Sequence, residues 1–171
     1  FALEDAASNR MVETGAVQGT VLFAASSLAR KLESETKPFS TARGDAVAAW
    51  GRGDFAQAVT LDPDFGAAWQ SWVEQLARSG NSAEALSVAD RAQARASLRT
   101  PLHKARIQWR AAALRKDDPA QIATLTSLAA LAPGDAGVLL TLAETEQRQR
   151  LFPQAAQHFR VVLALQPSNA D

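Results

Sequence analysis

The side chains that could do chemistry are few in this sequence. Its 171 residues include two histidines, His103 and His158, and no cysteine or tyrosine. Neither histidine has a neighbour at the spacing of a metal site such as H-E-x-x-H. Without cysteine there are no disulfides, thiolate zinc sites or cysteine nucleophiles. We therefore expect a protein that is not an enzyme and that has no catalytic residues, metal or cofactor.

Three further features resemble parts of active sites but have simpler interpretations. Asp117–Asp118 offers two adjacent carboxylates, but an aspartate just before a helix serves as its N-terminal cap. Gly51–Gly53 is interpreted as a turn, because a phosphate loop would end in G-K-[ST] and would follow a strand. We expect His158 to be a solvated or a rim residue on a helix, since no catalytic partner accompanies it.

The overall charge and hydropathy argue against nucleic acid and membrane partners. The sequence has 18 acidic and 18 basic side chains, so its formal net charge is zero. Long-range attraction to nucleic acid or to an anionic membrane is therefore not expected. The longest apolar run near the start, residues 21–25, is far shorter than the roughly 20 residues of a membrane span. With 47% hydrophobic residues the chain can form a globular core. A chain without cysteine fits the cytoplasm and the periplasm equally well.

The N-terminal segment, residues 1–39, is interpreted as a loose or partly helical lead-in followed by a helix. Apolar residues recur at three- and four-residue steps from residue 21 to residue 32, which is the pattern of an amphipathic helix. Pro38 ends this pattern, because the residue before a proline is displaced from helical geometry. The sequence begins with Phe1 rather than methionine, so we expect that an upstream segment has been removed.

The clearest pattern in the chain covers residues 136–167. It consists of two amphipathic stretches of helical period, joined by a short turn and closed by a proline. The positions that define it are Leu139, Leu142, Ala143, Ala155, Phe159, Val162, Leu165 and Pro167. This pattern resembles one tetratricopeptide repeat (TPR). The TPR signature has apolar residues on its first helix, and on its second an early small residue, an aromatic, a leucine and a final proline.

The same pattern recurs upstream at a fixed interval. Pro133 stands 34 residues before Pro167, and Leu125, Leu128 and Leu131 precede their counterparts by the same interval. A recurrence of this length is typical of stacked helical repeats. We expect TPR-like units over about residues 66–97, 102–133 and 136–167, and a degenerate, abbreviated unit over residues 40–63. The repeat domain would then span residues 40–171.

These units predict an all-α fold in which helical hairpins stack into a right-handed α-α superhelix, or solenoid. We expect about three and a half hairpins, preceded by one or two further helices. Ala85 and Ala155 should be buried, because the early small residue of each second helix lets two helices approach closely. Two residues depart from the TPR pattern: Trp109 replaces a small residue, and Gln121 replaces an alanine.

The resemblance also implies where a ligand would bind. In TPR proteins the first helix of each hairpin lines a concave groove. The corresponding positions here are Gln70, Glu74, Arg78, His103, Arg106, Arg110, Leu140, Glu144, Gln147 and Arg148. The basic residues His103, Lys104, Arg106, Arg110 and Arg115 cluster in one helix and would suit a peptide that carries carboxylates. The alternative is that these positions are only the solvated stripe of amphipathic helices. The lysine and asparagine of the chaperone-binding TPR clamp are absent, since Gln70 and Glu74 occupy their positions.

A non-catalytic protein–protein interaction module is therefore the expected function, with a peptide or partner helix bound in the groove. The alternative is a structural or oligomerisation segment of a larger bacterial signalling or regulatory protein. Residues 38–69 are loosely similar to the start of such arrays behind bacterial signalling or DNA-binding domains. Val161 and Leu163 add apolar surface beyond one inward stripe, so we expect an interface there. A downstream helix, the helix expected over residues 21–32 or a second copy in a homodimer would cover it.

Overall fold

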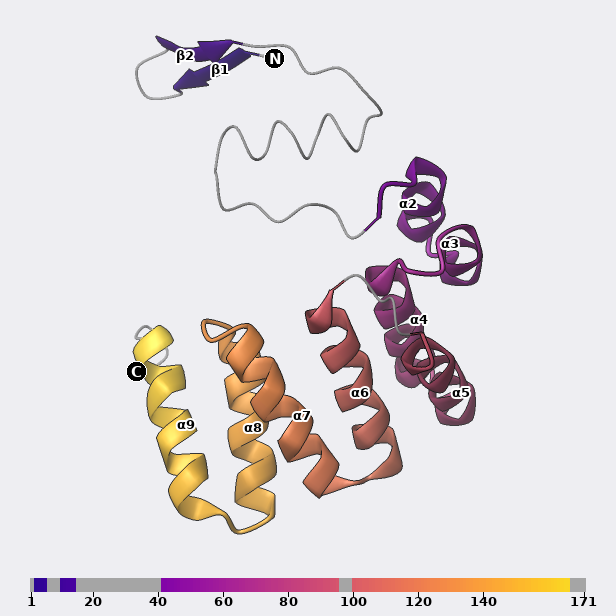
Figure 1. Ribbon diagram of the computed structural model, residues 1–171. Helices are drawn as coiled ribbons and strands as arrows, with labels where there is room; N and C mark the ends of the chain where they lie inside the picture. The colour runs from indigo at the N-terminus through magenta and orange to yellow at the C-terminus, as the bar shows by residue number, and fades with distance from the viewer. Residues whose placement is uncertain (1, 6–9, 15–40, 96–99, 167–171) are drawn as a thin grey trace.

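From residue 41 onward the described part of the chain is helical and its neighbouring helices are packed together, as the sequence predicts (Figure 1). The structure is a computed structural model that describes residues 2–5, 10–14, 41–95 and 100–166. From residue 41 onward these described residues form eight helices. They are α2 (Gly44–Gly51), α3 (Phe55–Leu61), α4 (Gly66–Arg78), α5 (Ser82–Gln93), α6 (Pro101–Arg115), α7 (Asp118–Leu131), α8 (Ala136–Arg148) and α9 (Phe152–Leu165).

The N-terminal lead-in differs from the expectation, because its described residues form a β-hairpin. Strand β1 (Ala2–Asp5) pairs antiparallel with β2 (Arg10–Thr14), with Ala2 opposite Thr14 and Asp5 opposite Arg10. The β-branched residues of β2 favour extended backbone, but two strands this short give a weak sequence signal. The prediction of a loose or partly helical segment is therefore wrong for these residues. The helix expected over residues 21–32 lies outside the described residues.

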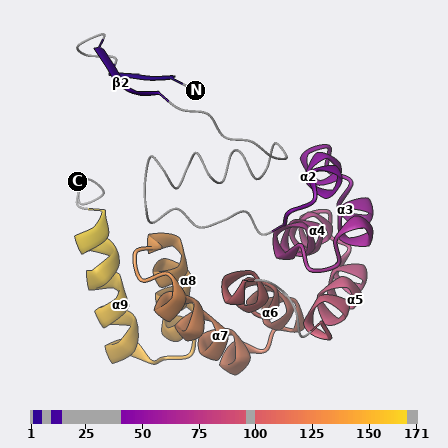
Figure 2. The same cartoon turned by 45° about the horizontal axis from the view of Figure 1, so that its top comes forward.

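The helices follow one another as hairpins along an arc. Within the pairs α2–α3, α4–α5, α6–α7 and α8–α9 the two helices pack together, and each second helix also contacts the first helix of the next pair. Figure 2 shows that α4, α6 and α8 lie on the inner side of the arc and that α5, α7 and α9 lie on its outer side. We call the surface formed by α4, α6 and α8 the inner face.

In the turn of each hairpin, one residue adopts the left-handed backbone conformation. Gly53 and Gly80 have φ values of 80° and 79°, as expected where glycine carries no steric penalty. Lys116 and Arg150 adopt φ values of 57° and 60° at the equivalent place, although they are not glycines. An L-residue in this conformation costs roughly 1–2 kcal/mol. In the α6–α7 and α8–α9 hairpins, packing therefore imposes a turn geometry that the residues of the turn do not favour.

The start of several helices is fixed by aspartate caps, as the sequence indicates for Asp117. Its side chain accepts a hydrogen bond from the backbone N–H of Ala120, and Asp54 caps α3 in the same way through Gln57. Asp135 caps α8 by accepting from Val138. Such caps are each worth about 1 kcal/mol, because they satisfy an amide that the first turn leaves without a partner.

The interior divides into two apolar clusters. The first cluster lies among α2 to α6 and includes the fully buried Phe65, Trp69 and Ile107. The second lies among α6, α7 and α8 and centres on Leu125, Leu128 and Leu142. Ala85 and Ala155 are buried, at 0% and 3% exposure, which confirms the prediction for these two small residues. Gln121, which stands where the TPR pattern has an alanine, is also buried, and its amide donates a hydrogen bond to Asp118.

Candidate functional site

The residues predicted to bind a ligand all lie on α4, α6 and α8, the helices of the inner face. Gln70, Glu74, His103, Arg106 and Arg110 are half-buried. Arg78 at the end of α4 is exposed, and so are Leu140, Glu144, Gln147 and Arg148 on α8. The face is therefore most recessed around α4 and α6 and most open along α8.

A hydrogen-bonded chain joins α4 to α6 across this face. The Nδ1 atom of His103 lies 3.0 Å from Oε1 of Gln70, and Nε2 of Gln70 donates to Oε1 of Glu74 at 2.9 Å. Because an amide oxygen only accepts, His103 must donate through Nδ1–H. The two helices approach closely because Gly66 has no side chain: a Cβ atom there would lie 2.9 Å from Cβ of His103. This chain fixes the orientation of all three side chains.

His103 is uncharged at neutral pH in this setting. Burial lowers its pKa below the usual value, because an imidazolium loses hydration there, and the positive charge of Arg106 lowers it further. Its tautomer then carries the proton on Nδ1, which the bond to Gln70 requires. His103 is thus a neutral framework residue rather than a cation of the predicted basic cluster.

Arg106 joins α6 to the start of α8. Its Nη2 atom lies 3.0 Å from Oδ2 of Asp135, whose other carboxylate oxygen caps α8. About a third of each side chain is exposed, so water screens the pair only in part. Arg115 likewise pairs with Asp90 of α5 at 2.6 Å. Two arginines of the predicted basic cluster are therefore already neutralised within the chain.

Arg148 is also paired rather than free. Its Nη2 atom lies 3.5 Å from Oδ1 of Asp118 on α7 and 3.3 Å from Oγ1 of Thr145. Glu144 and Gln147 make no hydrogen bond to other side chains of the described part of the chain. Of the predicted α8 residues, these two and Leu140 are the ones with unengaged side chains.

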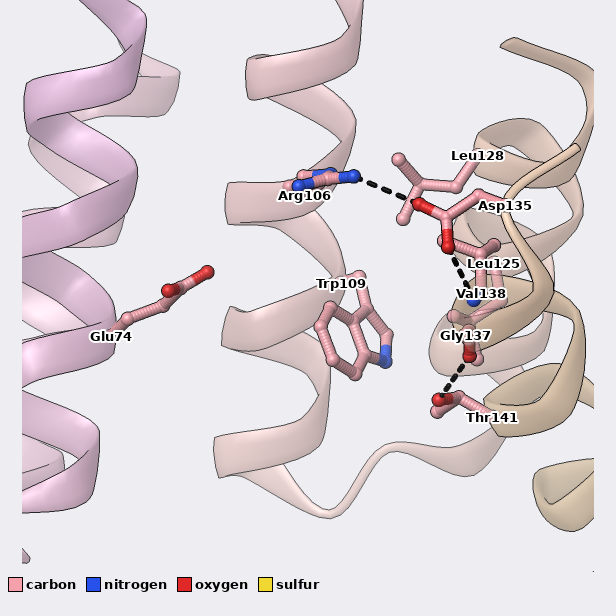
Figure 3. Close-up of a pocket in the computed structure, with 9 residues that line it drawn as sticks. All are labelled: Glu74, Arg106, Trp109, Leu125, Leu128, Asp135, Gly137, Val138 and Thr141. Atoms are coloured by element: carbon pink, nitrogen blue, oxygen red, sulfur yellow. Dashed lines mark hydrogen bonds and ion pairs between the residues drawn. The ribbon is translucent and has the colours of Figure 1, made fainter. Parts of the chain in front are cut away.

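A cavity of about 210 Å³ opens on the inner face beside Trp109 (Figure 3). Leu125, Leu128 and Val138 contribute apolar walls. Polar walls come from Glu74 on α4, from the Arg106–Asp135 pair, and from the first turns of α8. The helices α4 and α6 pack directly against each other, whereas α6 and α8 approach far less closely. Trp109 lies in this wider gap between α6 and α8, at a position where the TPR pattern has a small residue.

Among the described residues, shielded side-chain atoms of Gln93, Thr100, Trp109 and Arg110 have no hydrogen-bond partner, and two of these atoms are donors on neighbouring residues of α6. The Nε1 atom of Trp109 and the Nε atom of Arg110 are shielded from solvent and make no hydrogen bond within the described residues. The guanidinium of Arg110 stacks on Trp109, with Cζ 4.5 Å from the ring centroid. By contrast, Trp50 donates to Oγ of Ser71 at 2.9 Å, and Trp69 donates to the carbonyl of Pro63 at 2.8 Å. A shielded donor without a partner costs about 1–3 kcal/mol, and native proteins have few of them.

Sequence reasoning missed a second polar contact, between α8 and α9. Glu146 is buried, at 4% exposure, and its Oε2 atom lies 2.8 Å from Nδ1 of His158. The His158 side chain is 28% exposed. This partial exposure fits the expected rim position, and the structure adds a contact between His158 and a buried carboxylate that the sequence did not predict. The signal was present in the sequence: Glu146 continues the apolar stripe of Leu139, Leu142 and Ala143 by one helical step.

Most of the surface of α9 is exposed. Ala155 is its one buried residue in the described part of the chain. Val161 is 39% exposed and Leu163 is 51% exposed, and Phe152 and Leu165 are exposed as well. The surface at which we expect an interface is thus apolar and accessible in this structure.

Other kinds of site receive no support. No group of three or more residues able to hold a metal ion occurs among the residues that the structure describes. None of the described helices is both long enough and apolar enough to cross a membrane. Comparison with known proteins found no family model that matches the chain and no match among curated proteins.

Proposed function

We propose that this chain is a protein-interaction module, a right-handed solenoid of TPR-like hairpins whose inner face binds a peptide or a partner helix. The observation that carries the proposal is the set of exposed, unengaged side chains on one side of α8, Leu140, Glu144 and Gln147, on the face where α4, α6 and α8 contribute to a cavity. A protein chain presents donors and acceptors at regular intervals along its backbone, and exposed polar side chains of this kind can hydrogen-bond to them. The order of the helices along the arc, with α4, α6 and α8 innermost, supports the same assignment (Figure 2).

The inner face is preorganised for such a partner. The Gln70–His103 and Arg106–Asp135 contacts hold side chains of successive first helices in place before any ligand arrives. Fixed side chains lose less conformational entropy on binding, which favours affinity. Binding would therefore need little rearrangement of α4 and α6.

Charge favours a partner that is close to neutral. Among the predicted ligand-binding positions the charged ones are Arg78, Arg106, Arg110, Arg148, Glu74 and Glu144, and Asp135 and Asp118 pair with two of the arginines. Positive and negative charges balance in this set. A strongly acidic peptide, which the basic residues of α6 alone would suit, is thus not favoured.

Selection from a peptide library on the full chain tests the proposal. Peptides that are enriched should bind at least about tenfold more weakly to the double variant Arg78→Glu, Glu144→Lys, because both residues are exposed on the inner face and their loss leaves the core intact. The matched control is Arg160→Glu, an exposed residue of α9, which should bind the same peptides unchanged. Failure to enrich any peptide, or equal loss in the control, contradicts an inner-face ligand.

Self-association through α9 is a second candidate function, favoured by the bare apolar residues of that helix. Val161 and Leu163 are exposed together with Phe152 and Leu165. Val161 and Leu165 lie on one side of α9, and Phe152 and Leu163 lie on the other. Burying such apolar surface stabilises an interface by about 25 cal/mol per Å² of apolar area. In this version the chain is a homodimer or a structural segment of a larger assembly. Light scattering should then give a dimer mass that falls to the monomer value in the Val161→Lys, Leu163→Lys variant. A monomeric parent chain, or a dimer that survives both changes, excludes it.

A further inference from the structure

Two arginines at the end of α5 lie over tryptophans of α4. The Cζ atom of Arg91 is 5.5 Å from the ring centroid of Trp69 and 5.5 Å from that of Trp72. The Cζ atom of Arg95, which directly follows the C-cap of α5, is 6.0 Å from the Trp69 ring. The two indoles are themselves stacked, with their centroids 6.0 Å apart. These cation–π contacts hold both guanidinium groups at a defined place on the α4–α5 hairpin.

Both guanidinium groups are accessible and carry charge that the chain does not neutralise. Arg91 and Arg95 are exposed, and neither makes a hydrogen bond or an ion pair with any described residue. The acidic residues of α5 are engaged elsewhere. Asp90 pairs with Arg115 at 2.6 Å, and Glu84 accepts a hydrogen bond from the side chain at the N-cap of α5. Contact with the face of an indole uses none of the N–H donors of an arginine, so these donors remain available to an acceptor.

An open recess of about 530 Å³ lies beside the two arginines. Its described lining consists of Trp69, Arg91, Ala94 and Arg95, so it contains two cations and no acidic residue. Like charges at one recess repel each other, and no carboxylate of this lining offsets the repulsion. The recess therefore favours a ligand that brings negative charge to it.

The number of charges and donors selects among anions. A carboxylate has one negative charge and two oxygens, so it would neutralise only one of the two arginines. A phosphate monoester carries about −1.5 to −2 charges at neutral pH and has three strong acceptor oxygens. Planar guanidinium groups bind such oxygens through pairs of N–H donors. A phosphate monoester therefore matches Arg91 and Arg95 together, whereas a carboxylate does not.

We propose that Arg91 and Arg95 form a binding site for a phosphate monoester, and that Trp69 and Trp72 hold the two guanidinium groups in place. The site lies at the end of α5, an outer helix of the arc (Figure 2), so it is separate from the inner face and does not rest on the proposed function. Because the recess is open, the phosphate can belong to a small molecule or to a phosphorylated side chain, and the same two arginines bind it in either case.

An NMR titration of the ¹⁵N-labelled full chain at constant ionic strength tests the site. The probes are N-acetyl-phosphoserine amide, inorganic phosphate and N-acetyl-glutamate amide. The reporters are the backbone amide of Ala94, which lines the recess, and the indole N–H of Trp72. At least one of the phosphate probes should shift both reporters and saturate with a Kd in the millimolar range. The glutamate derivative should bind at least about tenfold more weakly, because its single charge satisfies only one arginine.

The variants Arg91→Gln and Arg95→Gln each remove one cation from the recess. Each should weaken binding of the phosphate probe at least about tenfold, because one set of charge-assisted hydrogen bonds is lost. Both side chains are exposed, so the core stays intact. The matched control is Arg160→Gln, which removes the same charge from an exposed position on α9 and should leave the Kd unchanged.

Three results would overturn the inference. The first is the absence of a saturable shift with either phosphate probe. The second is a glutamate derivative that binds as tightly as the phosphate probes, and this comparison uses the parent chain and depends on no variant. The third is a loss of affinity in Arg160→Gln as large as in Arg91→Gln and Arg95→Gln, because binding would then follow the total charge of the chain.

The same probes distinguish the source of the phosphate and separate this site from the inner face. Tighter binding of the phosphoserine derivative than of inorganic phosphate supports a phosphorylated side chain, and equal or weaker binding supports a small phosphate. Peptides selected on the inner face should bind Arg91→Gln as tightly as the parent chain, and a loss there would overturn a separate site. If no peptide is selected, the proposed function fails, while a phosphate-specific shift still supports this inference.

Discussion

Replacing His158 by alanine is expected to loosen α9 from α8. Glu146 is 4% exposed, and His158 is the one described side chain that hydrogen-bonds its carboxylate, at 2.8 Å. Leaving a buried polar group without its partner costs about 1–3 kcal/mol, and breaking a fully buried ion pair costs about 3–5 kcal/mol. Because the His158 side chain is 28% exposed, water can reach the carboxylate once the imidazole is gone. We therefore expect a loss of about 2 kcal/mol.

Hydrogen exchange measures this loss where it occurs. The stability of a helical array is distributed over its repeats, so a single unfolding midpoint would average the effect. A local loss of about 2 kcal/mol should accelerate exchange of the α9 amides roughly 30-fold, since 1.4 kcal/mol corresponds to a factor of ten. Amides of α4 and α5, which belong to a separate hairpin, should keep their exchange rates.

The variant Glu146→Gln provides the matched control. An amide keeps a hydrogen-bonding group next to His158 but removes the buried charge. Truncating His158 in that background should therefore have a smaller effect than in the parent chain, and the difference measures the coupling of the pair. Unchanged exchange in α9 of His158→Ala, or an acceleration spread equally over α4 and α5, would refute this assignment.

Three further predictions concern packing, turn geometry and pH. Ala155→Leu should destabilise the chain by about 1–3 kcal/mol in urea denaturation, because Ala155 is buried between α8 and α9, and an unchanged stability would contradict that contact. Arg150→Gly should stabilise the chain by about 0.5–1 kcal/mol, because glycine removes the cost of φ 60°. The gain is smaller than this full cost, since glycine has more conformational freedom in the unfolded chain. A loss of stability would show that the Arg150 side chain matters more than its backbone. The pKa of His103 is lowered in the folded state, so below about pH 6.5 the unfolded chain binds more protons at this residue than the folded chain does. The free energy of unfolding therefore decreases as the pH is lowered. In His103→Asn, whose amide can still donate to Gln70, urea midpoints at about pH 7.5 and pH 5.5 should differ less than in the parent chain, and an equal difference would refute the role of His103.

Local signals account for the part of the fold that the sequence predicts. The stripe of apolar residues at three- and four-residue steps requires helices, and the closing prolines and caps such as Asp117 mark their ends. Gly80, which follows α4 with φ 79°, is a further local signal of a helix end, because glycine adopts this conformation without strain. These features depend on neighbours within one turn, which a sequence displays directly. The β-hairpin escaped prediction because its strands of four and five residues carry little periodic signal.

The site was less predictable, because its contacts join residues far apart in the chain. The positions of Arg106 and His103 on the inner side of α6 followed from the repeat pattern, but their partners Asp135 and Gln70 lie 29 and 33 residues away. Only the packing of α4, α6 and α8 decides that these side chains meet. Trp109 was different: its departure from the repeat pattern was visible in the sequence. That departure marked the cavity, but the missing acceptor of its indole became apparent only in three dimensions.

The most direct test of the central claim, that the inner face binds a peptide, is chemical-shift mapping of the full chain with the tightest peptide from the library. We predict that backbone amides of α4, α6 and α8 and the indole resonance of Trp109 shift on titration. Amides of the outer helices α5, α7 and α9 should stay in place, because the inner helices separate them from the ligand. Shifts concentrated on α9 or on the outer helices, with α4, α6 and α8 unchanged, would contradict the claim.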